Sequence, residues 1–175
     1  PRTYTIDGCA VTAFTTAAIT SLTGVTDVTI NQGAGNDSIT IGTFASISLP
    51  NLTINGGTGN DGVNFLGNLT FAANANLDVD MQNDDANPGV DNVAFANSLQ
   101  VLLSGTGSAT IRTSRNVAIG TTGVFSTVDG NLTIEANQQV TPTTGNFIGV
   151  SIAANTEVKS TGTGVLSIKG KGGDF

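Results

Sequence analysis

Two segments of the chain repeat each other without gaps, and this repeat constrains the fold more than any other feature of the sequence. Residues 28–41 align with residues 52–65 at an offset of 24. The turn residues Asn31, Gly33, Gly35, Asn36 and Asp37 recur as Asn55, Gly57, Gly59, Asn60 and Asp61. Apolar residues alternate with polar ones on both sides of each turn, which is typical of short β-strands with one buried face.

Weaker copies of this pattern continue along the chain. Each has an alternating strand before a polar turn and an apolar strand after it: 77–81 with 93–95, 109–111 with 117–119, and 132–134 with 147–148. Residues 4–6 and 165–168 begin two more copies. The pattern predicts about seven units of roughly 22–30 residues, and strands this short bury their apolar face only by stacking on equivalent strands.

The composition favours strands and turns over helices. The chain has 27 Thr, 23 Gly and 18 Asn but only six Lys and Arg together, and no His. Thr with Val and Ile suits a pleated surface, while Gly and Asn suit tight turns. We therefore expect an all-β, right-handed parallel β-helix (β-solenoid) of about seven coils. An antiparallel sandwich or barrel is the competing fold, although it does not predict a gapless repeat with identical turns.

The whole sequence reads as one repetitive block. We expect residues 1–175 to form a single β-solenoid block, and residues 170–175 resemble a turn that leads into another strand. This predicts a fragment of a longer repetitive protein. No stretch has the 18 or more apolar residues of a membrane helix, so membrane insertion is not expected.

The repeated turns are candidate calcium sites. Residues 56–64 fit the pattern Gly-Gly-x-Gly-x-Asp-x-U-x, where U is a large apolar residue, and residues 32–40 depart from it only at Gln32. These turns resemble the calcium-binding repeats of haemolysin-type proteins. The resemblance implies calcium as a cofactor, with these ligand residues: Gly33, Gly35, Asp37, Gly57, Gly59 and Asp61. The open alternative is a set of solvated turn carboxylates, because Gly-x-Gly-Asn-Asp is also good turn chemistry.

Charge is distributed unevenly and limits the partners. Between Thr3 and Ile111 there are nine Asp and no basic residue. In a solenoid, Asp37 and Asp61 would stack and repel each other unless an ion lay between them, and Asp84, Asp85 or Asp91 would extend the file. Nucleic acid and anionic membrane surfaces are not expected partners, because both require clustered Lys and Arg.

Catalysis is not expected. The chain has no His, and its one cysteine, Cys9, lies in a small-residue context. Polysaccharide-cleaving β-helices need a basic residue near their acidic groups, whereas Arg112 and Arg115 flank a plain strand. A carbohydrate-binding or carbohydrate-cleaving β-helix remains the alternative function, although one Tyr and no Trp provide little aromatic surface for sugar stacking.

In its repetitive, strand-rich sequence, the chain is similar to the β-rich surface proteins of bacteria, such as filamentous-haemagglutinin-like and autotransporter-passenger sequences. The resemblance implies a structural and adhesive role in a secreted, cell-surface or extracellular fibre protein. The expected partners are other copies or adjacent blocks of the same protein, end to end, and cell-surface glycans or matrix. Four glycosylation sequons begin at Asn36, Asn51, Asn68 and Asn131, and three of them arise from a repeated Asn-Leu-Thr strand motif.

Overall fold

The fold consists of parallel β-strands. The computed structural model describes residues 2–7, 22–42, 44, 47–82 and 89–174, with only the backbone described for 2–7. These residues form sixteen strands, with no helix among them. Every described strand pair is parallel, as the register of the paired residues shows. The all-β prediction is confirmed, and the antiparallel alternative is wrong for the described strands.

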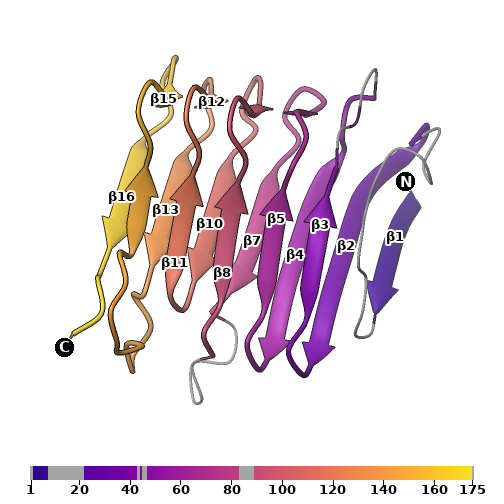
Figure 1. Cartoon of the computed structure of the whole chain (residues 1–175). Coiled ribbons are helices and arrows are strands. Elements are labelled where there is room, and N and C mark those ends of the chain that lie inside the picture. The colour runs from indigo at the N-terminus through magenta and orange to yellow at the C-terminus, as the bar shows by residue number, and fades with distance from the viewer. Residues whose placement is uncertain (1, 8–21, 43, 45–46, 83–88, 175) are drawn as a thin grey trace.

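The largest sheet has seven strands. Its order follows the chain from one end of the molecule to the other (Figure 1). The strands are β1 (Arg2–Asp7), β2 (Val25–Ala34), β4 (Asn51–Thr58), β7 (Leu77–Met81), β10 (Ala109–Thr113), β13 (Leu132–Ala136) and β16 (Leu166–Gly170). The 24-residue offset of the sequence repeat is the register of β2 on β4.

Two smaller sheets complete the structure. The five-stranded sheet holds β3 (Ser38–Ile41), β5 (Gly62–Phe65), β8 (Asn92–Phe95), β11 (Asn116–Ile119) and β14 (Val150–Ile152). The four-stranded sheet holds β6 (Leu69–Thr70), β9 (Gln100–Leu102), β12 (Val124–Thr127) and β15 (Glu157–Ser160). From β4 onward the chain visits the three sheets in turn and then returns to the first, one strand further along, which is consistent with a β-solenoid.

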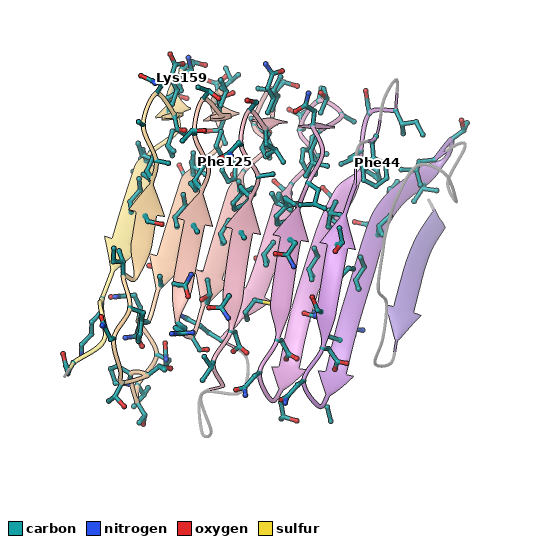
Figure 2. All side chains as sticks on the ribbon, in the orientation of Figure 1. Phe44, Phe125 and Lys159 are labelled. Carbon is teal, nitrogen blue, oxygen red and sulfur yellow. The ribbon has the colours of Figure 1, made fainter. Side chains whose placement is uncertain are left out.

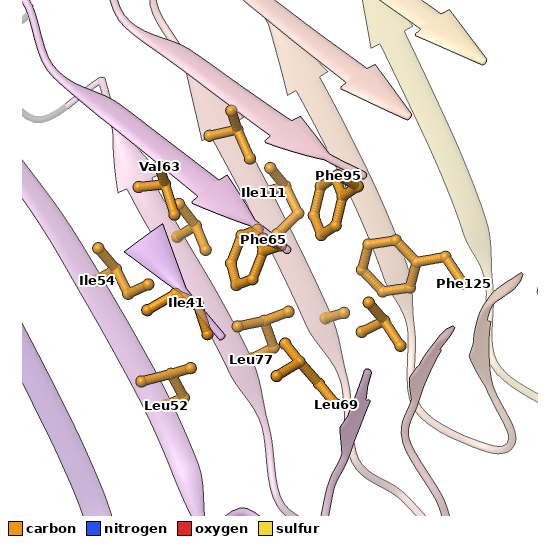
Figure 3. Close-up of a cluster of buried hydrophobic side chains, with 14 of the residues drawn as sticks. Ile41, Leu52, Ile54, Val63, Phe65, Leu69, Leu77, Phe95, Ile111 and Phe125 are labelled. Carbon is orange, nitrogen blue, oxygen red and sulfur yellow. The ribbon is translucent and has the colours of Figure 1, made fainter. Parts of the chain in front are cut away.

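Alternation along each strand produces the core between the sheets. In β7, Leu77, Val79 and Met81 are buried, whereas Asp78 and Asp80 between them are only half-buried. The same inward positions recur in the other strands and form one apolar cluster (Figure 3). Each fully buried Leu, Ile or Val contributes about 1.5–3 kcal/mol by leaving water, so the stacked files of apolar side chains hold the sheets together.

Aromatic rings stack inside this cluster. The Phe65 and Phe95 rings are stacked, with centroids 4.6 Å apart and ring planes almost parallel, at 6°. The Phe125 ring, from the four-stranded sheet, lies 5.3 Å from Phe95 and is tilted by 52° (Figure 3). These rings therefore link two of the sheets as well as successive strands within one of them.

The structure corrects two sequence-based expectations. The strand after β13 is Val150–Ile152, not 147–148, and Ile148 is 70% exposed. The strand is displaced because the Val117 N–H donates to Gly149 O, so pairing with β11 begins after the long turn. The Asn-Leu-Thr at Asn68 opens β6 in the four-stranded sheet, so it is not equivalent to the copies at Asn51 and Asn131.

No helix in the described part of the chain has the length and apolar character needed to cross a membrane. Cys9, Asp84 and Asp85, which the sequence singled out, lie outside the described residues.

Candidate functional site

The repeated Asn-Asp turns lie directly above one another. Each connects a strand of the seven-stranded sheet to a strand of the five-stranded sheet: β2 to β3 and β4 to β5. Gly33 pairs with Gly57 before the turns, and Ser38 pairs with Gly62 after them. The register is therefore unbroken across the turns, and Asp37 and Asp61 stack as expected.

Close packing along the stack explains the repeated glycines. Gly33, Gly35, Gly57 and Gly59 have φ values of +94°, +127°, +111° and +128°, a region that side chains other than glycine rarely adopt. A Cβ on Gly57 would lie 1.8 Å from Gly33 O, and one on Gly59 would lie 1.7 Å from Gly35 O. The carbonyls of Gly33 and Gly35 thus face Gly57 and Gly59, so stacking requires glycine at 57 and 59, whereas the positive φ is what favours glycine at 33 and 35.

The Asn of each turn binds the following turn. The Asn60 backbone N–H donates to Asn36 Oδ1 at 2.9 Å, and the Val90 N–H donates to Asn60 Oδ1 at 2.7 Å. These side chains are exposed or half-exposed, and each satisfies a backbone donor that the turn itself leaves free.

The Asp of each turn binds in the opposite direction. The Asp37 N–H donates to Asp61 Oδ1 at 2.8 Å, and the Asp61 N–H donates to Asp91 Oδ1 at 2.6 Å. Asp61 and Asp91 are each only 2% exposed. Hydrogen bonds to an ionised carboxylate are stronger than those between neutral groups. The Asn of each turn thus accepts from the turn that follows, and the Asp accepts from the turn before it.

The acidic file continues to Asp91 and then ends at a serine. The Asp91 N–H donates to Ser114 Oγ at 3.0 Å, and that hydroxyl lies 2.7 Å from Asp91 Oδ2 and 2.9 Å from Gly89 O. Among the described residues, Asp91 therefore extends the file. Backbone N–H groups reduce the expected repulsion between the stacked carboxylates, and the sequence pattern did not predict this contribution.

Two buried acceptor oxygens lie at the connection from β2 to β3. Gln32 is 3% exposed, and its Nε2 donates to Gly62 O at 3.2 Å. Gln32 Oε1 and Asp37 Oδ2 are both buried and have no hydrogen-bond partner among the described residues. A buried polar atom left without a partner costs about 1–3 kcal/mol, and oxygen acceptors are the ligands that Ca²⁺ takes.

These oxygens suit a hard cation in type, although carboxylates do not gather around one point. Among the described residues, no group of three or more acidic, His or Cys side chains is placed to hold a metal ion. A cation at the first turn would thus depend on Asp37, on carbonyl and amide oxygens, and on Gln32. The sequence drew attention to Gln32 only as a departure from the repeat.

The sequon asparagines are part of the same stacking system. In addition to Asn36, the side-chain oxygens of Asn51, Asn68 and Asn131 each accept a backbone N–H from the next level of the stack, at 2.8–2.9 Å. The donors are Asn76, Gln100 and Val165. These contacts give each sequon asparagine a structural role within the repeat.

A column of charged residues crosses the outer face of the seven-stranded sheet, and the sequence pattern did not predict it. Asp80, Arg112, Glu135 and Lys169 occupy one register position on four successive strands. Arg112 Nε lies 3.4 Å from Glu135 Oε2, and Lys169 Nζ lies 2.9 Å from Glu135 Oε1. The Lys169 hydrogen bond is the main cause that lowers the Glu135 pKa, and Arg112 adds to it.

The neighbouring column contains an acid among hydroxyl residues. Asp78 pairs with Thr53 on one side and Thr110 on the other. Burial raises the Asp78 pKa, the Arg112 charge opposes this shift, and Asp80 adds to it. The acid is therefore held in a position where its charged form is disfavoured.

Comparison with models of known protein families, with curated proteins and with solved structures found no match to this chain.

Proposed function

We propose that this chain is a structural and adhesive rod of a secreted or cell-surface protein, built as a right-handed β-solenoid of about seven coils. The seven-stranded sheet supports the coil number, since each coil would contribute one strand to it. Right-handed crossovers are nearly universal between parallel strands of one sheet, which supports the handedness.

The observation that carries this proposal is the continuous bonding of each coil to the next. Side-chain oxygens accept backbone N–H groups from neighbouring coils at the Asn-Asp turns and also at the entrances to the strands. Such bonds add to the parallel ladders of three sheets. A chain bonded in this way along its length is suited to hold a polar surface rigidly at a distance.

The outer surface suits an extracellular role. Thr and Asn are abundant, and charged residues make up 11% of the chain. An adhesive surface of this kind would act through many weak hydrogen bonds rather than through one pocket.

A force measurement tests the structural role. The chain is held by its two ends between reference domains and stretched one molecule at a time. We expect stepwise lengthening as coils detach, each step releasing roughly 80–120 Å, because a coil holds about 24–34 residues and an extended residue spans about 3.5 Å. Release of the whole chain in one low-force event would contradict a rod stabilised coil by coil.

We further propose that calcium stabilises the first Asn-Asp turns. Within the predicted ligand set, Asp37 would hold the ion, and Gln32 would add a second buried oxygen. The support is the two buried acceptor oxygens without hydrogen-bond partners among the described residues, Gln32 Oε1 near the end of β2 and Asp37 Oδ2 in the turn that follows. Calcium would neutralise charge along an Asp file that has no basic residue near it in the sequence.

Calorimetry of the chelator-treated chain tests this second part. At calcium concentrations about 100 times the dissociation constant, binding adds about 2.7 kcal/mol, a rise in Tm of roughly 5–10 °C for a chain of this size. Asp37→Asn should remove most of the rise, whereas Asp129→Asn, which changes an acid at a different corner, should preserve it. Equal Tm values with calcium and with chelator would contradict the proposal.

A further inference from the structure

The outer face of the seven-stranded sheet holds two columns of polar side chains that cross the same four strands, β7, β10, β13 and β16. The first column has one charged residue on each strand: Asp80, Arg112, Glu135 and Lys169. The second, two residues earlier on each strand, has an acid followed by hydroxyl residues: Asp78, Thr110, Thr133 and Ser167. Residues two apart on a strand point to the same side, so both columns lie on one face of the sheet.

The charges are unequal from one end of this face to the other. Glu135 lies between Arg112 and Lys169 and forms an ion pair with each, so this group of three carries one net positive charge. Asp80 has no basic side chain within ion-pair distance among the described residues. Asp78 adds a second carboxyl group on the same strand. The face therefore runs from an acidic end at β7 to a basic end at β16.

The charged groups are open to solvent. The side chain of Lys169 is 60% exposed and that of Arg112 is 41% exposed. Asp80 is half-buried, and Glu135 retains 18% exposure between its two partners. A second charged surface can thus contact both the acidic and the basic end of this face.

The whole chain has the same polarity along the stack. Residues 3–111 contain nine Asp and no basic residue, whereas residues 112–175 contain five Lys and Arg and four acidic residues. These two parts occupy opposite halves of the sheet (Figure 1). Two copies placed side by side with opposite coil order would bring the acidic half of each against the less acidic half of the other, which is the favourable arrangement.

The symmetry of such a pair determines which residues meet. A two-fold axis parallel to the strands, midway between β10 and β13, brings two of these faces together with opposite coil order and repeats every contact twice. Across the interface, each column then faces itself in reverse. Four residue pairs result: Asp80 with Lys169, Arg112 with Glu135, Asp78 with Ser167, and Thr110 with Thr133. An axis along the charged column would instead place each charge opposite its own copy.

We propose that two copies of this chain pair side by side through the outer face of the seven-stranded sheet, with opposite coil order, which goes beyond the proposed rod by naming a partner for one of its faces. Every charge in the first column then faces an opposite charge, and Asp78 gains a hydroxyl donor. The column spans only about 14 Å at about 4.8 Å per strand. An interface this small is weak, so charge decides which orientation forms.

Charge reversal on the face tests this pairing. The full chain and its variants are followed by sedimentation velocity over a range of concentrations at low salt. Asp80→Lys and Lys169→Glu each place like charges at both symmetric contacts, so each variant alone should have a dissociation constant about tenfold higher than the native chain. An equimolar mixture should regain association, because the reversed positions of the two variants then face each other with opposite signs, and so do the native ones.

Matched controls make the same changes of charge on another sheet. Lys159 and Glu157 pair with each other on β15, away from the seven-stranded sheet (Figure 2). Lys159→Glu and Glu157→Lys change the net charge as much as the two test variants, and they should leave association unchanged. The mixture controls for folding, since variants that failed to fold would not regain association.

A native chain that stays monomeric at high concentration would overturn the side-by-side proposal, and so would assemblies larger than a dimer, because a two-fold pair closes on itself. Test variants that associate like the native chain, a mixture that remains dissociated, or β15 controls that weaken association equally would also overturn it. A monomeric chain that still lengthens coil by coil under force would overturn this inference alone and leave the structural role standing.

Discussion

The Asp61 carboxylate accepts the backbone N–H of Asp37 across the stack at 2.8 Å, while the residue before each Asp binds in the other direction. Asp61 is almost fully buried, whereas Asn36 is exposed. The two acceptors of one turn motif therefore work in different surroundings, and their removal should have different costs.

Asp61→Ala should lower the free energy of unfolding by about 1–3 kcal/mol, because it leaves the part-buried backbone donor of Asp37 without its acceptor. Asn36→Ala should cost less, since water can replace the exposed acceptor. Urea denaturation of both variants measures the difference. A larger loss for Asn36→Ala would contradict the roles assigned to the two side chains.

Gly59→Ala should be severely destabilising, by about 3 kcal/mol or more, because the new Cβ would lie 1.7 Å from Gly35 O. Gly145→Ala is a matched control. Gly145 has a φ of +115°, close to the +128° of Gly59, but its Cβ would meet no atom within 4 Å. The control should lose only the backbone strain, about 1–2 kcal/mol. Thermal or urea unfolding checks both, and equal losses would show that close stacking is not the cause.

Asp78→Thr should stabilise the chain by about 0.5–1 kcal/mol at pH 7, since it continues the column formed by Thr53 and Thr110. The Asp78 pKa is raised in the folded state, so stability falls as pH rises from the ordinary value of 3.8 through the folded value. The gain from the substitution should therefore shrink below pH 3.8. Urea unfolding at pH 7 and pH 3 measures it, and an equal gain at both would contradict a charge effect.

Glu135→Gln should reduce stability at pH 7 by about 0.5–1 kcal/mol, because it removes the acid between Arg112 and Lys169. The Glu135 pKa is lowered in the folded state. Its contribution is therefore present above the unfolded pKa and is lost as pH falls through the folded one. The variant and the native chain should converge in acid. Glu157→Gln, at an exposed pair on β15, should show little effect at either pH.

The strand class, the parallel stacking and the register of the β2–β3 turn on the β4–β5 turn follow from the amino-acid sequence. Residues 28–41 and 52–65 have equal length and the same turn residues, so they stack only with Gly33 on Gly57 and Ile30 on Ile54. Alternation of apolar and polar residues within each strand then decided which side chains enter the core. These features are local or repeat at a constant interval, and for that reason the sequence shows them.

Contacts between coils of unequal length become visible only in the folded chain. Arg112 and Glu135 are separated by 23 residues and Glu135 and Lys169 by 34, so no constant period in the sequence reveals their column. Asn36 accepts a backbone N–H from the following turn, whereas Asp61 accepts one from the preceding turn. This difference depends on the backbone path of each turn, which the residue types do not specify. Gln32 is buried where its side chain donates to Gly62 O, in the next coil. β14 starts late because the Val117 N–H donates to Gly149 O. Both features depend on hydrogen bonds between coils.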